Sequence, residues 1–422
     1  MTSKRIQLRH GVWLNMVQTD RFKTGCFSIN LLQPLAEHTA SVYALLPSVL
    51  LRGCSEYPNI QTISCRLDVL YGATVGAQVR KKGEVHAIGL YADFLEDCYA
   101  DDEPVFAQMM DFLRQLLFEP CMEGDGFVKS YVDGEKQNLL NTIASRINDK
   151  RSYAVNRLLK HMCAGEAYGV TRLGEKEALE HVDHVSLYTV WQYLLKTSAI
   201  ELFYLGQKSE TEVIEQMKKL LSHLPEREKL CHPETLVVLP NRPVQTVEES
   251  MDVTQGKLSI GFRTSITGQD EKYPALLLMN SVFGAGMTSK LFMKIREEQS
   301  LCYYASSSLD KFKGILAVTS GIEFEKYEVA KQGILQQLDD CKKGEITEEE
   351  LESARNYLVS GLRACNDNPG QMDDYVIGQA VAGSQKTVDD LISALEGVTM
   401  QQVIDAANSV TLDTIYFLKG VQ

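Results

Sequence analysis

The sequence predicts an α+β fold of two similar domains, each a largely antiparallel sheet with helices on one face. Three observations lead to this prediction. The 422 residues are too many for one ordinary hydrophobic core. Segments that alternate apolar and polar residues are interspersed with longer segments whose apolar residues recur every 3.6 positions. A strand–helix–glycine pattern returns after 231 positions, where Gly25 matches Gly256 and Gly53 matches Gly284.

The first domain is predicted over 1–224. Its central helix runs from Ala40, with an apolar stripe along one side, and Gly53 is expected to close it as a left-handed C′ residue. A second amphipathic helix begins near Ile60 and ends at Gly72. The other elements follow from the same periodicities: strands over 12–17, 26–32, 73–79, 85–91 and 199–205, and helices over 105–117, 127–146, 153–163, 185–196 and 210–224.

Residues 225–244 are predicted to link the domains, because they hold four prolines among charged residues and show no sustained period. The second domain is predicted over 245–422. It begins like the first, with an alternating strand over 256–262 and then a helix over 273–283 that Gly284 ends.

Composition excludes several functions. The net charge of −13 argues against nucleic acid or an anionic membrane surface as a partner. No run approaches eighteen apolar residues, so no membrane span is expected. The ten cysteines form no Cys-x-x-Cys pair and favour small buried thiols in a reducing cytoplasm. His181 and His184 flank Asp183 at a predicted helix start, where helix capping is a better interpretation than a metal site.

The central helix contains Ala44-Leu45-Leu46-Pro47-Ser48, nine residues ahead of Gly53. In its strand–helix–Gly–helix–Gly–strand setting, this segment resembles the place where the insulinase-like (M16) metallopeptidases carry His-x-x-Glu-His. The resemblance assigns the two metal histidines to Ala44 and Ser48 and the catalytic base to Pro47. Alanine has no ligand atom, serine is a poor zinc ligand, and proline has no proton-accepting side chain.

The third zinc ligand of that family is a glutamate on a long helix, seven residues after another glutamate. Glu135-Lys136 matches the start of this pattern, but the ligand position holds Thr142. The resemblance therefore implies a chain with degenerate zinc and base positions at Ala44, Pro47, Ser48 and Thr142. No catalytic residue, no metal and no cofactor is predicted for it.

The most specific similarity to the family lies in the second half, over residues 284–303. This run resembles the family's glycine turn and its R-E-x-x-x-L-x-Y segment. The resemblance implies that Arg296 and Tyr303 bind the substrate backbone: a guanidinium donates to a peptide carbonyl, and a phenol donates to a developing oxyanion. The alternative is that Arg296 pairs with Glu297 or Glu298 on a solvated helix and that Tyr303 is a core strand residue.

The resemblance also implies a clamshell of two M16-like domains around a peptide-binding cavity. Three hypotheses for function follow. The first is a non-catalytic subunit of a heteromeric bacterial M16 peptidase, whose partner carries His-x-x-Glu-His. The second is a stand-alone peptide-binding or scaffold protein, as a monomer or a homodimer. The third is an active zinc peptidase with a non-standard ligand set.

Overall fold

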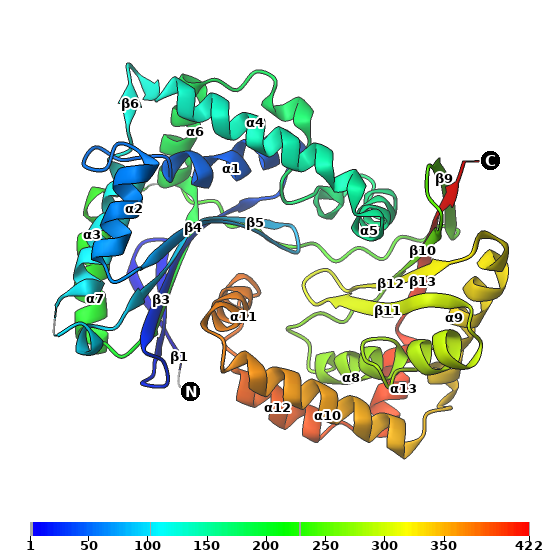
Figure 1. Ribbon diagram of the computed structural model, residues 1–422. Helices are drawn as coiled ribbons and strands as arrows, with labels where there is room; N and C mark the ends of the chain where they lie inside the picture. Colours follow the sequence, from blue (N-terminus) through cyan, green and yellow to red (C-terminus); the bar gives the residue numbers. More distant parts are fainter. Residues whose placement is uncertain (1–2, 102, 228, 422) are drawn as a thin grey trace. The chain divides into compact units, whose positions relative to one another are not determined.

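The computed structural model describes residues 3–101, 103–227 and 229–421 (Figure 1). The chain forms two compact units, and each unit gathers three stretches of sequence. Unit 1 contains Met1–Ala144, Val170–Glu234 and Pro369–Val381, and unit 2 contains Ser145–Gly169, Thr235–Asn368 and Ala382–Gln422. The domain boundaries at 1–224 and 245–422 stay a prediction, since packing and sequence order divide the chain in different ways.

Unit 1 is built on a six-stranded sheet. Its strands lie in the order β1 (Ser3–Arg9), β2 (Val12–Gln18), β8 (Ala199–Gly206), β3 (Thr24–Pro34), β5 (Val85–Leu95) and β4 (Thr74–Lys82). All neighbouring strands are antiparallel except β2 and β8, which run parallel. The largely antiparallel sheet expected from the sequence is therefore confirmed.

Six helices from the first half of the chain cover one face of this sheet (Figure 1). They enclose a single large core, in which alternate residues of β3 such as Phe27, Ile29 and Leu31 meet Leu45 and Val49 of the first helix. Alternation in the strand and the 3.6-residue period of the helix bring these apolar side chains together. The helices are α1 (Glu37–Leu50), α2 (Ile60–Val69), α3 (Val105–Phe118), α4 (Lys129–Ser145), α6 (His184–Thr197) and α7 (Glu210–Leu220).

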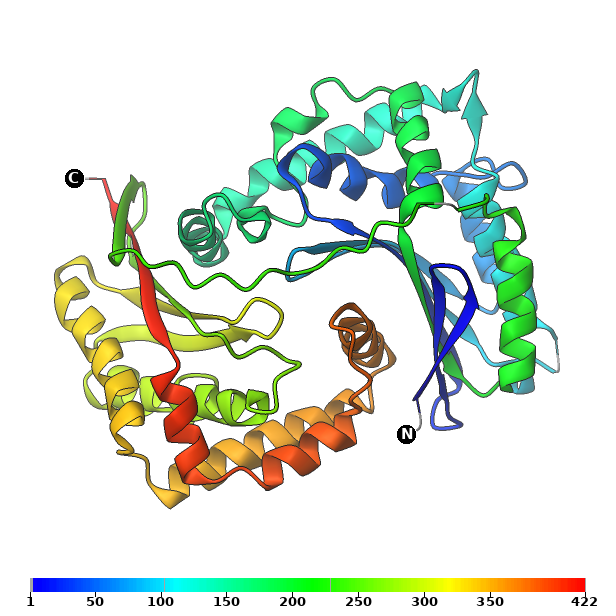
Figure 2. The same cartoon turned by 180° about the vertical axis from the view of Figure 1, so that it is seen from behind.

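Unit 2 repeats this topology with one strand fewer. Its sheet has the order β11 (Cys302–Asp310), β12 (Ile315–Ile322), β10 (Gly256–Arg263), β13 (Thr411–Gly420) and β9 (Gln245–Met251), again with one parallel pair, β9 and β13. Figure 2 shows β13 in red, directly after the last helix. The order matches β4-β5-β3-β8-β2 of unit 1, so the predicted duplication is confirmed at the level of topology.

The helices of unit 2 follow the same succession along the chain. They are α8 (Tyr273–Phe283), the π-helix η6 (Leu291–Glu298), α9 (Tyr327–Lys343), α10 (Glu348–Cys365), α12 (Val388–Glu396) and α13 (Met400–Asn408). Their apolar sides form a second core with the sheet, in which Leu258 and Ile260 of β10 meet Leu276 and Met279 of α8. Each unit therefore has a core of its own.

Each half of the chain contributes one helix to the other unit. Helix α5 (Lys150–Met162) comes from the first half and packs on β10 and β13 of unit 2. Helix α11 (Pro369–Val381) comes from the second half and packs on β8 and β3 of unit 1. Since β8 and β3 correspond to β13 and β10, the exchange is reciprocal.

A buried carboxylate anchors α11 to unit 1. Asp373 accepts hydrogen bonds from the Ser28 hydroxyl at 2.7 Å and the Gln78 amide at 3.2 Å. It also forms an ion pair with Arg80 at 2.5 Å, and its side chain is almost fully buried. Three donors and one positive charge offset the cost of burying this carboxylate.

Two local expectations are corrected. Helix α1 begins at Glu37 rather than Ala40, because the polar residues 37–39 form its first turn, where the Glu37 carboxylate favours a helix N-terminus. Gly53 does not adopt the left-handed conformation predicted for it; a Cβ there would lie 2.6 Å from the Pro58 carbonyl oxygen. Glycine is needed at position 53 because the backbone at Pro58 approaches too closely to leave room for a side chain. Gly72, where the second helix was expected to end, has φ +73° after α2.

No helix among the described residues combines the length and the apolar character needed to cross a membrane.

Candidate functional site

Helix α1 carries three of the positions that the sequence predicts to correspond to a zinc-binding motif. Ala44 and Pro47 are buried, and Ser48 is partly exposed. Pro47 lies in the helix interior and has no N–H, so the carbonyl four residues earlier loses its helical donor. The helix nevertheless continues, with the Leu51 amide donating to the Pro47 carbonyl at 3.3 Å. The three positions thus offer a methyl group, a pyrrolidine ring and one hydroxyl.

Helix α4 carries the fourth position. Thr142 is exposed, and its hydroxyl donates to the Asn138 carbonyl one turn earlier at 2.9 Å. Earlier on the helix, Glu135 forms an ion pair with Arg52 at 3.1 Å, and the Arg52 guanidinium lies 5.3 Å from the centroid of the Tyr131 ring. This pair places the segment after α1 beside α4, although the two are distant in sequence.

The described residues contain no group of three or more His, Cys, Asp or Glu side chains arranged to hold a metal ion. His181 and His184 flank Asp183, whose side chain accepts from the backbone N–H groups of Val185 and Ser186. The helix-capping interpretation of this segment is therefore confirmed. Within unit 1, the side chains at the four degenerate positions offer hydroxyl groups but no imidazole or carboxylate.

The second candidate segment lies in unit 2 and starts with η6. The Gln299 amide donates to the Lys294 carbonyl, five residues earlier, at 3.1 Å, which is the π-helical spacing. Ser300 then adopts φ +51°, an uncommon conformation for a residue with a side chain. The chain turns sharply there and enters β11. Short π-helical segments recur at functional sites in proteins.

Tyr303 occupies a β-bulge at the start of β11. Cys302 pairs with Ile322 and Tyr304 pairs with Gly321, so two consecutive residues of β12 face three of β11. The extra residue is Tyr303, and β11 is an edge strand of its sheet. Bulges at sheet edges turn a side chain away from the regular alternation. Tyr303 is 60% exposed, and among the described residues its hydroxyl has no hydrogen-bond partner.

Arg296 lies in the last turn of η6. Its guanidinium is 3.5 Å from the Glu297 carboxylate and 4.6 Å from the centroid of the Phe292 ring. The pairing with Glu297 considered in the alternative interpretation is thus present. The other half of that alternative, a core position for Tyr303, is wrong, because the bulge leaves its side chain in solvent.

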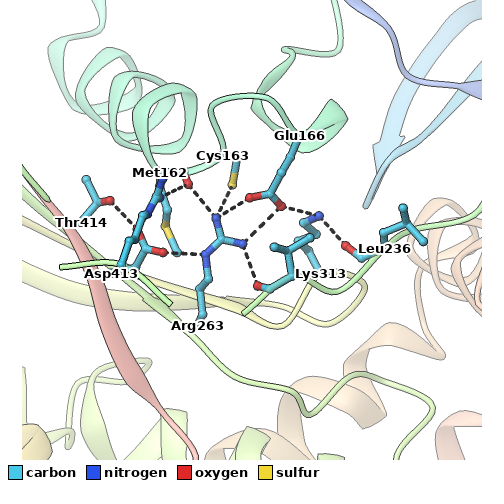
Figure 3. Close-up of polar contacts among 10 residues, drawn as sticks. Met162, Cys163, Glu166, Leu236, Arg263, Lys313, Asp413 and Thr414 are labelled. Atoms are coloured by element: carbon cyan, nitrogen blue, oxygen red, sulfur yellow. Dashed lines mark hydrogen bonds and ion pairs between the residues drawn. The ribbon is translucent and has the colours of Figure 1, made fainter. Parts of the chain in front are cut away.

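Sequence reasoning missed a buried ionic cluster in unit 2 (Figure 3). Arg263 on β10 donates from Nε to Asp413 at 2.7 Å and from Nη2 to Glu166 at 2.6 Å. Nη2 also donates to the carbonyl of Met162, the last residue of α5, at 2.6 Å. Lys313, fully buried, completes the cluster with an ion pair to Glu166 at 2.6 Å. A cation at a helix C-terminus satisfies carbonyls that the helix leaves free.

This cluster holds α5 and the linker on the sheet of unit 2. Lys313 donates to the Leu236 carbonyl, and Arg263 donates to the Val238 carbonyl at 3.0 Å. Burial alone would raise the pKa of Glu166, but hydrogen bonds and charges from Arg263 and Lys313 bring it below its usual value. No local sequence pattern predicts the cluster, because the acidic partners of Arg263 lie 97 and 150 positions away in the sequence.

Two α+β units share one topology, and the four positions expected to carry a zinc motif hold Ala44, Pro47, Ser48 and Thr142. These features are those of an inactive homologue of metallopeptidases. The chain belongs to the M16 peptidase family. A family model described as "Peptidase M16 inactive domain" matches residues 181–358. "Probable inactive metalloprotease YmfF" of Bacillus subtilis (strain 168) is 33% identical over 420 residues, which cover 98% of this chain and 96% of that protein.

Solved structures share the whole fold. The crystal structure of a conserved protein from Enterococcus faecalis V583 has a TM-score of 0.92 and 29% sequence identity, and the match covers 99% of each chain. The structure of a peptidase M16 inactive domain from Pseudomonas fluorescens has a TM-score of 0.82 at 14% identity, covering 100% of this chain and 99% of that one. At that identity the likeness shows the fold alone.

Proposed function

We propose that this chain is a non-catalytic subunit of a heteromeric M16-type zinc peptidase and that it contributes Arg296 and Tyr303 to substrate binding by an active partner. The observation that carries the proposal is Tyr303. A bulge on an edge strand presents its side chain to solvent with an unengaged hydroxyl. A phenol held in this way can donate to a carbonyl or an oxyanion without first breaking an internal hydrogen bond.

The degenerate positions support the other half of the proposal. Ala44, Pro47, Ser48 and Thr142 lack the imidazole and carboxylate groups that zinc hydrolysis needs, so a partner would have to supply the metal and the base. Arg296 would act as a second donor toward a bound peptide. Its guanidinium is stacked on Phe292 and retains donors for a further acceptor, because Glu297 contacts only Nε.

The test begins with affinity purification of the full chain from its native host. A protein carrying His-x-x-Glu-His is expected in the eluate, and the reconstituted pair is expected to cleave unstructured peptides. Tyr303→Phe should leave partner binding intact and lower turnover by about a hundred-fold or more, the usual cost of losing one oxyanion donor. Unchanged turnover in that variant would remove Tyr303 from the site.

Tyr357→Phe is the matched control, because Tyr357 is a similarly exposed tyrosine on α10 of the same unit. It should change neither binding nor turnover. If the chain purifies alone, light scattering separates the stand-alone monomer from the homodimer. All ten cysteines are free thiols, which fits the further proposal of a cytoplasmic location.

A further inference from the structure

Two positively charged side chains in unit 2 lie close to the same aromatic ring. The Arg151 guanidinium, from the first turn of α5, lies 4.4 Å from the centroid of the Tyr304 ring. The Lys257 ammonium, from β10, lies 5.8 Å from the same centroid. Tyr304 follows the bulged Tyr303 directly on β11. The two cations therefore lie on the sheet face next to the residue proposed to bind substrate.

The register of the sheet explains how the ring reaches both cations. Lys257, Gly321 and Tyr304 form one row across β10, β12 and β11. Gly321 has no side chain, so the Tyr304 ring lies over its backbone; a Cβ there would overlap the ring. In the next row, the hydroxyls of Ser306 and Thr319 lie 3.3 Å apart.

The two cations form no ion pair among the described residues, although the charge of the nearby Asp149 carboxylate acts on Arg151. Arg151 donates to the Ser306 hydroxyl at 2.9 Å, and Lys257 donates to the Gln255 amide oxygen, so the partners of both cations are neutral. Neither forms an ion pair with a carboxylate among the described residues. The nearby Asp149 is engaged as the N-cap of α5 and accepts from two backbone amides and the Ser152 hydroxyl.

Titration behaviour agrees with this geometry. Burial lowers the pKa of Lys257, and the neighbouring charge of Arg151 lowers it further. Burial raises the pKa of Tyr304 to about 12, so its hydroxyl stays protonated and can donate a hydrogen bond. Two like charges at a partly buried aromatic ring are a costly arrangement until an anion joins them.

We propose that Arg151, Lys257 and Tyr304 form a binding site for a carboxylate side chain of an extended peptide. The inference rests on the proposed function, because it assumes that the chain binds peptides beside Tyr303. The site would make the chain prefer peptides that carry Asp or Glu at one position. An extended peptide that pairs with the outer edge of β11 would direct every second side chain over the face that carries Tyr304 and Ser306.

The outer edge of β11 supports this placement. It pairs with β12 on one side only, and the Ser307 amide is engaged by the Gly284 carbonyl at 2.9 Å. The stretch that remains for an added strand thus begins at the bulge and ends before Ser307. It includes Tyr304 and Ser306, both of which contact Arg151, so a peptide carboxylate on this face would meet Arg151 first. Lys257 lies two strands further in, on β10, and would attract the carboxylate over a longer distance.

The test is an mRNA-display experiment, in which a library of short randomised peptides is selected for binding to the immobilised full chain. Peptides enriched by the wild type should carry Asp or Glu at one position about five-fold more often than the starting library, the upper range for a partly exposed ion pair. Arg151→Gln and Lys257→Gln should each abolish this preference. Arg151→Lys, which keeps the charge, should retain part of it.

Two further variants separate geometry from charge. Gly321→Ala displaces the Tyr304 ring and should weaken the acidic preference with every charge retained. Lys331→Gln removes one positive charge from α9, where it pairs with Glu328, and should leave the preference unchanged. Enrichment of peptides without an acidic bias would overturn this inference while supporting peptide binding. Failure to enrich any peptide would overturn peptide binding by this chain, and the carboxylate site with it.

Discussion

Arg80 on β4 and Asp373 on α11 form a buried ion pair of 2.5 Å across 293 positions of sequence. The pair ties an element of the second half of the chain to the sheet of the first half. The Asp373 carboxylate also accepts hydrogen bonds from the Ser28 hydroxyl and the Gln78 amide. The stability of unit 1 therefore depends on a helix that is encoded far from the rest of it.

Asp373→Ala is expected to lower the free energy of unfolding of the full chain by about 3 kcal/mol, because it removes the buried acceptor of Ser28, Gln78 and Arg80 and leaves Arg80 only the exposed Asp374 carboxylate, 3.6 Å away. Urea denaturation monitored by circular dichroism measures the change. Glu396→Gln is the control: it breaks an exposed pair with Arg363 at 3.7 Å and should cost less than about 1 kcal/mol. Equal effects of the two variants would contradict an anchoring role for Asp373.

His86 should make stability fall in mild acid. It is buried against Tyr43, and burial lowers its pKa from 6.5 to about 4. The unfolded chain therefore takes up the proton first as the pH falls. The stabilisation is fully present above pH 6.5 and is lost between about pH 6.5 and 4, with a total change of roughly 3 kcal/mol.

Urea melts over that pH range test the assignment to His86. His86→Phe keeps a ring beside Tyr43 and should flatten the pH dependence. His232→Gln, at an exposed position, should leave the slope as in the wild type. A wild-type slope in His86→Phe would mean that another group takes up the proton.

Pro47→Ala is expected to raise the melting temperature of the chain. An interior helical proline costs about 3 kcal/mol relative to alanine, and the gain should be about 1–3 kcal/mol because removal of the buried ring leaves some space. Differential scanning calorimetry gives the change. The control is Pro274→Ala in the first turn of α8, where proline is tolerated and no gain is expected.

The isolated chain is expected to bind no zinc and to hydrolyse no peptide. The variant that combines Ala44→His, Pro47→Glu, Ser48→His and Thr142→Glu should gain zinc, since three ligands and a base then occupy the positions of the family motif. Elemental analysis after dialysis measures the metal content. Leaving Thr142 unchanged should weaken binding.

Stoichiometric zinc in the unmodified chain would contradict this prediction and favour an active enzyme with a non-standard ligand set. A folded quadruple variant without zinc would show that Ala44, Pro47, Ser48 and Thr142 are not the counterparts of the ligands and the base.

Sequence periodicity predicted most elements, because strands and amphipathic helices carry their own local signal. The end of α2 before Gly72 and the Asp183 cap were predictable for the same reason. The π-helix and the bulge at Tyr303 were not. An apolar pattern does not distinguish five-residue from four-residue hydrogen bonding, and a bulge appears only when two strands are paired. The exposure of Tyr303, on which the proposed site depends, follows from that pairing.

The helix exchange and the ionic cluster around Arg263 were beyond sequence reasoning for a different reason. Each depends on residues that meet only after the chain has closed long loops, and a polar residue such as Asp373 carries no local sign of its partner. The degenerate positions stay a prediction, which was possible because the family motif supplied the spacing. Their burial, at Ala44 and Pro47, came from the structure.

The reciprocal exchange of α5 and α11 has a consequence for biosynthesis. All strands of unit 1 have been synthesised once Glu234 has been made, yet the helix that packs on β3 and β8 ends at Val381. At ordinary translation speeds this delay is roughly 7–30 s. During that time Ser28, Gln78 and Arg80 have no carboxylate, and α5 has no sheet. The nascent chain would need help from a chaperone or fold only after release, and expressing either half alone would yield a permanently incomplete protein.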